Sequence, residues 1–317
     1  MMNSLRPNIR NDRVAKGLRP STRESTPRPE ASSLQPLLPV RRATAAIGTF
    51  LHLELHGPDT TALHRTADRA FALARRLSHQ FSRFEPNGEV GRLNAWPAHR
   101  PFGASLRLRR LLAKALRIWR ESDGAFDPTP LTGFRLGPAI RIQGTRVIRE
   151  DPDAKLDLGA IAKGFIIDEI VSLLRRAGVV AGLVNAGGDI RAFGERTWHI
   201  HLRDPHHPGR SIAEIPIRDA ALCVSAETFR PGHIRDPRCG GVPAGPAAAA
   251  AVLARTAADA DAWATALFVE SRAGLRKWFA HRAMAGLVIE SFGTQAIRSW
   301  RTNNFPTGPA SAGSIVR

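Results

Sequence analysis

The stretch Lys155-Leu-Asp-Leu-Gly-Ala-Ile-Ala-Lys-Gly164 joins two kinds of structure that the sequence predicts. Residues 155–159 are expected to form a short strand. From Ile161 onward, apolar residues recur at intervals of three and four, which is the period of a helix. Gly178 follows this pattern and is expected to end the helix, because glycine readily adopts the left-handed conformation found at helix ends. The sequence therefore predicts a strand-to-helix junction here.

The segments on both sides of this junction mix strands with separated helices. Turn-rich sequence over residues 81–94 connects the first two helices. We expect a single mixed α+β domain with an antiparallel-type sheet and packed helices, rather than a doubly wound parallel sheet. The expected helices are residues 60–82, 104–121, 257–269 and 271–283, and the expected strands lie within residues 43–55, 181–185, 198–202 and 286–290, with a turn at Gly187-Gly188-Asp189.

Composition divides the chain into one folded region and two tails. Residues 1–40 are rich in Pro, Ser, Arg and Asn and show no periodic pattern, so we expect a disordered basic tail. Residues 41–305 are expected to form one domain, and residues 306–317 a flexible C-terminal tail. Hydrophobic residues make up 43% of the 317 residues, which is enough for a sizeable core.

The net charge of +18 suggests nucleic-acid binding, but the distribution of the charge argues against it. Only five of the 46 basic residues are lysines, and the 41 arginines are scattered along the chain. No basic run is interleaved with aromatic residues, as stacking on bases requires. We therefore expect no nucleic-acid partner, although the charge can attract an anionic ligand.

Hydropathy and cysteine content exclude further classes of protein. No apolar stretch approaches 18 residues, so we expect no integral membrane protein. The first 30 residues carry several basic residues but no apolar segment of a secretory signal, so the expected location is cytoplasmic. Cys223 and Cys239 are too few for a disulfide scaffold, and their spacing matches no zinc module.

Residues 157–164 combine small side chains, a predicted helix start and Lys163. Small residues let a ligand approach the backbone, a helix N-terminus attracts anions, and the lysine adds a positive charge. The spacing matches neither a Walker sequence nor a Rossmann fingerprint. From these residues alone, a phosphate site and a tight structural turn both remain open.

Asp261 and Thr265 are four residues apart and share one face of a predicted helix. A carboxylate and a hydroxyl on one face can supply the oxygen ligands that Mg²⁺ or Ca²⁺ prefers. The alternative is a helix N-terminus at which Asp259 and Asp261 interact favourably with the helix dipole.

Two further segments carry chemical groups beside turns. His233, within Gly232-His-Ile-Arg-Asp-Pro-Arg238, could act as a general base because its ordinary pKa lies near neutrality. One of eleven histidines carries little weight by itself. The segment Asp123-Gly-Ala-Phe-Asp-Pro128 is typical of a turn after a helix.

Taken in order, these segments resemble the flavin transferase family, the FAD:protein FMN transferases. The resemblance extends from residue 43 to about residue 300. The matching segments are Ile47-Gly-Thr-Phe50, Ser82-Arg-Phe-Glu-Pro86, Leu93-Asn-Ala95, Gly124-Ala-Phe-Asp-Pro128, Leu156-Asp-Leu-Gly-Ala-Ile-Ala-Lys-Gly164, Val184-Asn-Ala-Gly-Gly-Asp-Ile190, Trp198-His-Ile-His-Leu-Arg-Asp-Pro205, His233-Ile-Arg-Asp-Pro237 and Ala260-Asp-Ala-Trp-Ala-Thr-Ala-Leu-Phe268.

The resemblance implies roles for individual residues. His233 would lie near the attacking hydroxyl of an acceptor protein. Mg²⁺ would be bound by the side chains of Asp261 and Thr265 and by the backbone carbonyls of Ala160 and Ala264. The residues that would contact FAD are Ile47, Phe84, Ala125, Phe126, Asp127, Asp157, Lys163 and Ile234.

The implied activity is Mg²⁺-dependent transfer of FMN from FAD to a Thr or Ser hydroxyl of an acceptor protein, with release of AMP. Two alternatives stay open. The first is an FAD pyrophosphatase, in which water replaces the acceptor and the products are free FMN and AMP. The second is a module that binds FAD without catalysis.

Overall fold

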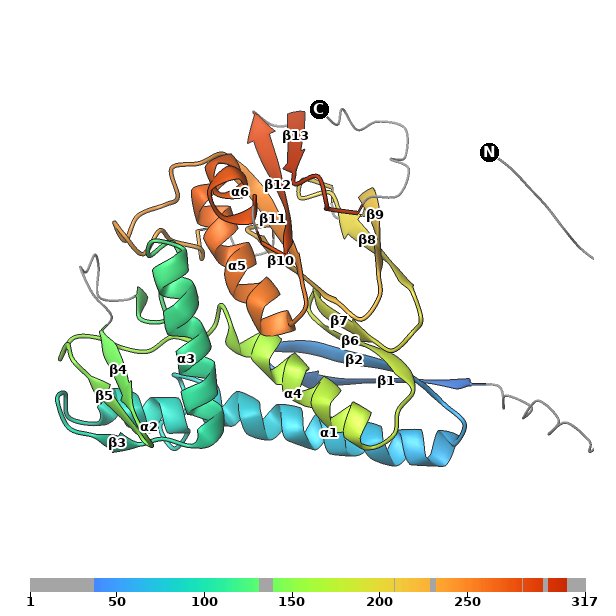
Figure 1. Ribbon diagram of the computed structural model, residues 1–317, viewed down its shortest axis with the longest axis horizontal. Coiled ribbons are helices and arrows are strands. Elements are labelled where there is room, and N and C mark those ends of the chain that lie inside the picture. Colours follow the sequence, from blue (N-terminus) through green and yellow to red (C-terminus); the bar gives the residue numbers. More distant parts are fainter. Residues whose placement is uncertain are drawn as a thin grey trace, which may run out of the picture. The chain divides into compact units, whose positions relative to one another are not determined.

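The computed structural model describes residues 37–130, 139–207, 209–228, 232–280, 282–292 and 296–306 (Figure 1). Of the expected basic tail, residues 1–40, the part up to residue 36 lies outside the described residues. Of the expected C-terminal tail, residues 306–317, the part from residue 307 onward also lies outside them. Leu38 already belongs to the first strand, so regular structure begins before residue 41.

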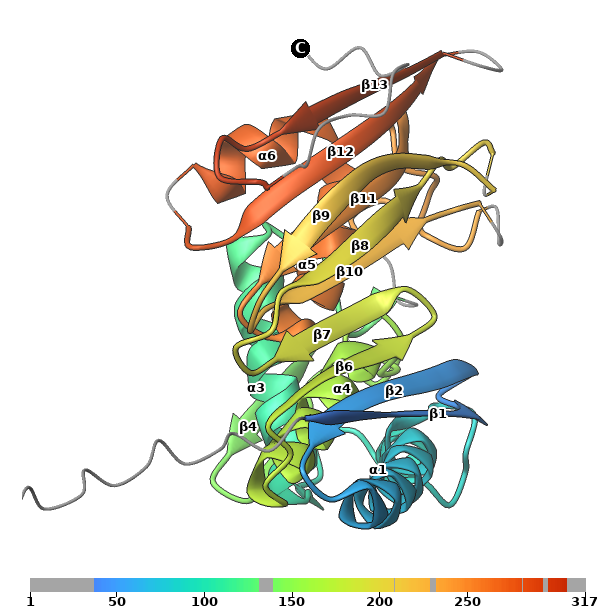
Figure 2. The ribbon, with the colours of Figure 1, turned by 90° about the vertical axis from the view of Figure 1, so that its right-hand side faces the viewer.

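An antiparallel sheet of eight strands organises the described part of the chain (Figure 2). Strands that follow one another in the sequence mostly pair as hairpins, and the longest jump joins the first hairpin to a strand more than 120 residues later. The strands, in the order in which they pair, are β1 (Leu38–Ala46), β2 (Thr49–Gly57), β6 (Ala181–Ala186), β7 (Asp189–Phe193), β10 (Ala221–Ala226), β11 (Ala247–Ala254), β12 (Ala285–Phe292) and β13 (Ala296–Arg301).

Helices cover one face of this sheet and form the larger core with it (Figures 1 and 2). Helix α5 (Ala257–Glu270) is the central one. It packs against α3 (Leu106–Glu121), α4 (Ala162–Arg176) and the sheet, so nearly every side chain along it is buried. The side chain of Thr256 caps its first turn by accepting from the backbone N–H of Asp259. The helices are α1 (Thr60–Phe81), α2 (Glu89–Ala95), α3 (Leu106–Glu121), α4 (Ala162–Arg176), α5 (Ala257–Glu270) and α6 (Arg272–Phe279).

Two smaller sheets complete the described structure. Strands β8 (Trp198–Arg203) and β9 (Ser211–Ile217) pair with each other and cover part of the opposite face of the large sheet, where they bury a second apolar cluster (Figure 2). Strands β3 (Phe102–Gly103), β5 (Arg146–Arg149) and β4 (Ile140–Gln143) form a small sheet beside α3. No helix in the described ranges is long and apolar enough to span a membrane.

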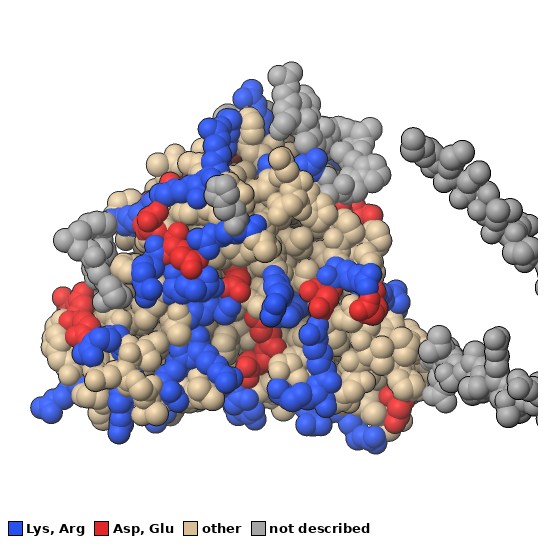
Figure 3. All heavy atoms as spheres, in the orientation of Figure 1, with Lys and Arg blue, Asp and Glu red and all other residues tan. Residues whose placement is uncertain are grey.

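Basic and acidic side chains are interspersed over the face seen in Figure 3. Several of them form ion pairs between helices. Lys114 and Arg117 of α3 contact Asp259 of α5 at 2.7 and 2.6 Å, and Arg117 also contacts Glu121 at 3.0 Å. Part of the large positive charge is therefore paired within the fold.

The structure confirms the expected α+β class and most of the expected elements. Helix α4 ends as expected, because Gly178 has a φ of +81° and donates its N–H to the carbonyl of Arg175. The connection over residues 81–94 holds a short helix, α2, that its turn-rich sequence obscures. Within residues 43–55 the chain makes a hairpin of two strands, because Ile47 and Gly48 form a tight turn.

Residues 155–159 are not a strand, which corrects the expectation from the sequence. The backbone of Leu156 exchanges two hydrogen bonds with the side-chain amide of Asn94, at 2.8 and 2.9 Å. The N–H of Asp157 donates to the carbonyl of Pro128 at 2.9 Å. A side chain and a loop therefore satisfy the backbone groups that a neighbouring strand would otherwise have satisfied.

Candidate functional site

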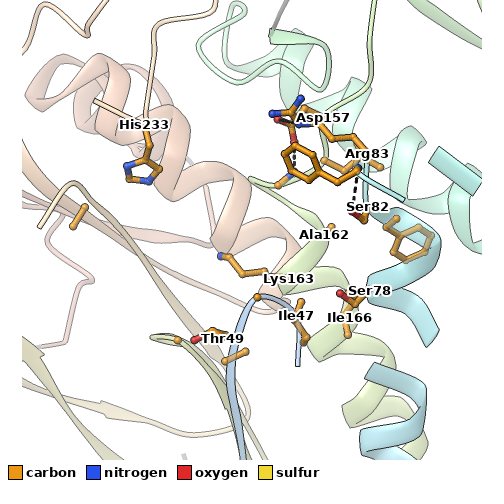
Figure 4. Close-up of a pocket in the computed structure, with 18 residues that line it drawn as sticks. Ile47, Thr49, Ser78, Ser82, Arg83, Asp157, Ala162, Lys163, Ile166 and His233 are labelled. Carbon is orange, nitrogen blue, oxygen red and sulfur yellow. Dashed lines mark hydrogen bonds and ion pairs between the residues drawn. The ribbon is translucent and has the colours of Figure 1, made fainter. Parts of the chain in front are cut away.

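A cavity of about 570 Å³ opens at one end of the large sheet (Figure 4). Its walls come from the β1–β2 and β6–β7 turns, the end of α1, the start of α4 and the segment that carries His233. Cavities of roughly 300–1,000 Å³ are typical of small-molecule sites. The residues that line the cavity include Ile47, Thr49, Arg83, Phe84, Asp157, Lys163 and His233.

The β1–β2 turn holds Ile47 in an unusual backbone conformation at the edge of the cavity. Ile47 has a φ of 59° and Gly48 a φ of 70°, as in a two-residue turn of type I′. Glycine and asparagine favour this region, whereas a β-branched residue is strained there. Strain of this kind is often found at ligand sites.

Lys163 extends from the first turn of α4 to a pair of buried carboxylates. Its ammonium forms an ion pair with Asp189 and lies 3.5 Å from Oδ1 of Asp261. Asp189 and Asp261 are only 3% and 4% exposed. Burial alone would lower the pKa of Lys163, but the two carboxylates outweigh it and hold that pKa above its usual range. The lysine is therefore a stable positive charge beside the cavity.

Asp261 lies at the crossing of α4 and α5. Its Oδ2 accepts a 3.0 Å hydrogen bond from the backbone N–H of Gly164. The helices can approach this closely because Gly164 has no side chain, since a Cβ there would lie 2.2 Å from the carbonyl oxygen of Ala257. Burial raises the pKa of Asp261 to about 6, although the neighbouring Lys163 ammonium opposes the shift.

Thr265 lies one helical turn after Asp261 and faces β10. Its Oγ1 is 3.3 Å from the carbonyl oxygen of Asp261 and 3.2 Å from the hydroxyl of Ser225. Within the described residues, no three His, Cys, Asp or Glu side chains gather to hold a metal. A cation here would depend on Asp261 with hydroxyl and carbonyl oxygens.

The donor set at this place fits Mg²⁺. Oxygen atoms of carboxylate, hydroxyl and carbonyl groups are the ligands that Mg²⁺ prefers. Two buried carboxylates, Asp189 and Asp261, face a single ammonium group, so the cluster has an excess negative charge that a cation would offset. Ala160 lies in the turn just before α4, close in the chain to Lys163, and Ala264 lies within α5 next to Thr265.

The neighbouring Asp259 has a different environment. It lies in the first turn of α5, accepts from the Thr256 hydroxyl and pairs with Lys114 and Arg117. Burial would raise the pKa of Asp259, but the two cations outweigh it and lower that pKa. The helix-terminus interpretation therefore fits Asp259, while the buried position of Asp261 fits a ligand.

Arg83 and Asp157 form the polar wall of the cavity opposite Lys163 (Figure 4). Oδ2 of Asp157 is 3.0 Å from Nε of Arg83, and its Oδ1 accepts from the N–H of Gly159 at 2.9 Å. The Arg83 guanidinium lies 4.1 Å from the centre of the Phe84 ring. Phe84 is 76% exposed, so this flat surface is open to a ligand.

His233 lines the cavity from a loop that arginine side chains hold in place. Arg238 pairs with Asp236 of the same loop and with Glu270 at the end of α5, both at 2.7 Å. The loop is therefore attached to the helix that carries Asp261. His233 itself is exposed to solvent.

The structure brings some of the expected site residues to this cavity and leaves others outside its lining. Ile47, Phe84, Asp157, Lys163 and His233 line it, and Asp261 contacts Lys163. The remaining expected FAD contacts stay predictions: Ala125, Phe126 and Ile234 are buried, and Asp127 lines a separate hollow of about 220 Å³.

Sequence reasoning assigned no chemical role to several residues of the site. Asp189 is the main partner of Lys163, and Arg83, Thr49 and Ser225 lie beside the cavity or beside Thr265. The only local signal for Asp189 is its place directly after the Gly187-Gly188 turn. Aspartate is common in turns, so the burial of the Asp189 side chain could not be inferred from its position in the sequence.

The family model of the ApbE family matches residues 47–136 and 130–288, most of the chain. The chain belongs to the ApbE family. Among curated relatives of this ApbE-family chain, an FAD:protein FMN transferase of Treponema pallidum is 28% identical over 287 residues, covering 72% of this chain and 78% of that protein. One of Rhodobacter capsulatus is 29% identical over 272 residues, covering 73% of this chain and 51% of that protein.

Solved structures of the ApbE family share the fold. The flavin transferase ApbE from Vibrio cholerae superposes with a TM-score of 0.74 at 23% identity, covering 85% of this chain and 99% of that one. The apo form of the Pseudomonas stutzeri flavinyl transferase ApbE gives a TM-score of 0.73 at 24% identity, covering 86% and 96%.

Proposed function

We propose that this chain transfers FMN from FAD to a threonine or serine hydroxyl of an acceptor protein, with Mg²⁺ bound and AMP released. The observation that carries the proposal is the contact between Lys163 and Asp261 beside a cavity of ligand size. An ammonium group next to a carboxylate that can bind a cation suits a reaction at a polyanionic pyrophosphate. Family membership and the names of the T. pallidum and R. capsulatus relatives support the same activity.

The metal site of this proposal consists of the side chains of Asp261 and Thr265 and the carbonyls of Ala160 and Ala264. When bound there, Mg²⁺ would supply positive charge to the pyrophosphate oxygens. Lys163 supplies a second positive charge from the same corner of the cavity. Its ammonium is held by Asp189, so a ligand phosphate can meet a charge that is already oriented.

The flavin nucleotide would occupy the cavity between the β1–β2 turn and the Arg83–Phe84 wall. Ile47 offers an apolar contact, and the exposed Phe84 ring offers a stacking surface. Ala125 and Phe126 are buried, so in this proposal they shape the wall or offer backbone groups. Asp127 and Ile234 complete the proposed contacts to FAD.

The group transfer itself exchanges one phosphorus–oxygen bond for another. The acceptor hydroxyl oxygen bonds to the FMN-side phosphorus while the bridging bond to AMP breaks, and AMP leaves with the electron pair. His233 accepts the hydroxyl proton, because it lines the cavity and is open to the solvent from which the acceptor arrives. Phosphoryl transfer depends mainly on positioning and charge, which Lys163 supplies here.

The test mixes the purified protein with FAD, Mg²⁺ and a pool of synthetic peptides, each with a single threonine. We expect peptides that gain the mass of an FMN group and AMP that is released in equal amount. Matched peptides with valine in place of threonine should gain nothing.

The outcomes distinguish the three candidate activities. AMP release without any labelled peptide or protein acceptor would mean an FAD pyrophosphatase. FAD binding without AMP release would mean a binding module. The cytoplasmic location expected from the sequence stays a prediction.

A further inference from the structure

Strand β1 has one edge that pairs with no other strand in the described part of the chain. In a two-residue hairpin the pair that flanks the turn exchanges both hydrogen bonds, and the pairs then alternate. Ala46 and Thr49 flank this turn, so Ala46, Thr44 and Arg42 bond to β2. The N–H and C=O groups of Ala45, Ala43 and Arg41 therefore point away from the sheet.

The half of this edge near the cavity lacks the features that normally protect an edge strand. Natural edges are usually shortened, bulged, or guarded by lysine or proline. The β1–β2 register runs over nine pairs without a bulge, and Pro39 and Arg41 lie in the half of β1 far from the cavity. Near the cavity, the backbone groups that point away from the sheet belong to Ala43 and Ala45, which are both exposed. Such an edge is suited to pair with an added strand.

The edge leads directly to the functional site. Strand β1 ends at the turn whose Ile47 and Gly48 line the cavity. Helix α1 runs beside it toward the same end, where Ser78 and Ser82 also line the cavity (Figures 1 and 2). A segment paired with β1 would therefore have its next residues at the mouth of the cavity.

The side of α1 that faces β1 is basic near the cavity. Arg42 of β1 bonds to His64 and Asp68 of α1 at 3.2 and 2.8 Å, which identifies the stripe of the helix next to the strand. Helical spacing continues this stripe through Arg75 and His79, which are both exposed, and His79 lies 3.6 Å from Glu85. Acidic side chains on an added segment would meet the Arg75 guanidinium.

We infer that an extended, acidic segment of the acceptor protein pairs with the edge of β1 that is unpaired among the described residues, and so delivers its hydroxyl to the cavity. This inference rests on the proposed function, because it specifies how the acceptor of that reaction is held. Because the pairing uses backbone hydrogen bonds, it can align the acceptor segment without requiring particular side chains at most of its positions. The basic stripe of α1 adds a preference for acidic residues.

The first test changes the peptide and leaves the protein intact. The probe is the threonine peptide that is labelled fastest, prepared in two versions. In one phase the N-methyl groups are on the odd-numbered residues, and in the other phase they are on the even-numbered residues. Alternate N–H groups of a strand point to opposite sides, so only one phase removes the N–H groups that face β1. We expect labelling to fall about fivefold for each hydrogen bond lost in that phase and to change little in the other phase.

Hydrogen exchange gives a second readout that needs no variant. The amides of Ala43 and Ala45 should exchange rapidly in the free protein at every protein concentration. Saturating unmethylated peptide should slow them. Slow exchange without peptide would mean that the edge is already covered by this chain or by a second copy, which would overturn the inference.

Charge reversal tests the basic stripe with a matched control. Arg75→Glu should raise the KM for an acidic peptide about tenfold and leave the dissociation constant of FAD unchanged. Arg69→Glu makes the same charge change on a different exposed stripe of α1 and should have a much smaller effect.

The outcomes separate this inference from the proposed function. Labelled peptides with equal sensitivity to both methylation phases would overturn pairing with β1 and leave the flavin transfer standing. If no acceptor is ever labelled, the transfer and the inference that rests on it both fail.

Discussion

The backbone N–H of Gly164 and Oδ2 of Asp261, 97 residues apart in the chain, form a 3.0 Å hydrogen bond. The bond joins the first turn of α4 to α5 and places the Asp261 carboxylate beside Lys163. It requires the absence of a side chain at residue 164, where a Cβ would lie 2.2 Å from a backbone oxygen of α5. Helix packing and the proposed metal site therefore depend on the same contact.

Replacing Gly164 with alanine should destabilise the protein and disturb the site together. The added methyl group has to displace the backbone of α5, which should reduce the free energy of unfolding by about 1–3 kcal/mol. Urea denaturation measures this loss. Gly209→Ala is the control, since nothing lies within 4 Å of its added Cβ, and it should change stability by less than about 0.5 kcal/mol. Equal effects of the two variants would contradict the close packing.

Removing the oxygen ligands should weaken Mg²⁺ binding. Asp261→Asn loses a charged ligand, so we expect the Mg²⁺ dissociation constant to rise about 10- to 100-fold, and Thr265→Ala should raise it less. Calorimetric titration gives both values. Asp259→Asn removes a carboxylate from the same helix and should lower stability while leaving Mg²⁺ affinity intact, because its partners are Lys114 and Arg117. Unchanged affinity in Asp261→Asn and Thr265→Ala would rule out this metal site.

Lys163 should affect both stability and ligand choice. Lys163→Met leaves Asp189 and Asp261 without their shared ammonium, and we expect a loss of about 2–3 kcal/mol, below the range for fully buried pairs because the lysine is partly exposed. The variant should weaken FAD binding more than riboflavin binding, since riboflavin has no phosphate. The double variant Lys163→Met/Asp189→Asn should recover stability but not FAD affinity. Equal losses for the two ligands in fluorescence titrations would limit Lys163 to a structural role.

Replacing Ile47 in the strained turn should increase the stability of the protein and weaken its binding of FAD. Ile47→Asn suits the left-handed conformation at this position, so the free energy of unfolding should increase by about 1 kcal/mol. The apolar contact to the flavin is lost, and FAD should bind more weakly. Gly48→Ala, also at a positive φ, should instead lower stability by about 1 kcal/mol. Thermal unfolding and FAD titration test this pair, and a less stable Ile47→Asn would show that the backbone there is not strained.

His233 should be needed for transfer and not for binding. His233→Ala is expected to retain FAD and Mg²⁺ and to lose transfer about 10²–10⁴-fold, the usual contribution of a general base. His201→Ala, an exposed histidine on β8, serves as the control. The rate of peptide labelling is the measurement. Transfer by His233→Ala at the rate of the unmodified protein would mean that another group accepts the proton.

Local pattern in the sequence predicted most of the helices and strands, because their signals depend on neighbouring residues. The helix expected at residues 60–82 is observed as α1 from Thr60 to Phe81, and the expected glycine at residue 178 ends α4. The same local reasoning was wrong for residues 155–159, where the side chain of Asn94 takes the hydrogen bonds of a strand. That partner is some 60 residues away, so no local pattern could indicate it.

The sequence by itself determined the α+β class, the shared helix face of Asp261 and Thr265, and the resemblance to flavin transferases. The tertiary structure alone decided that Asp189 shares Lys163 with Asp261, and that the edge of β1 ends at the cavity. The reason is physical. Periodicity and capping act over a few residues, whereas burial of a charge and convergence of turns depend on how distant segments pack against one another.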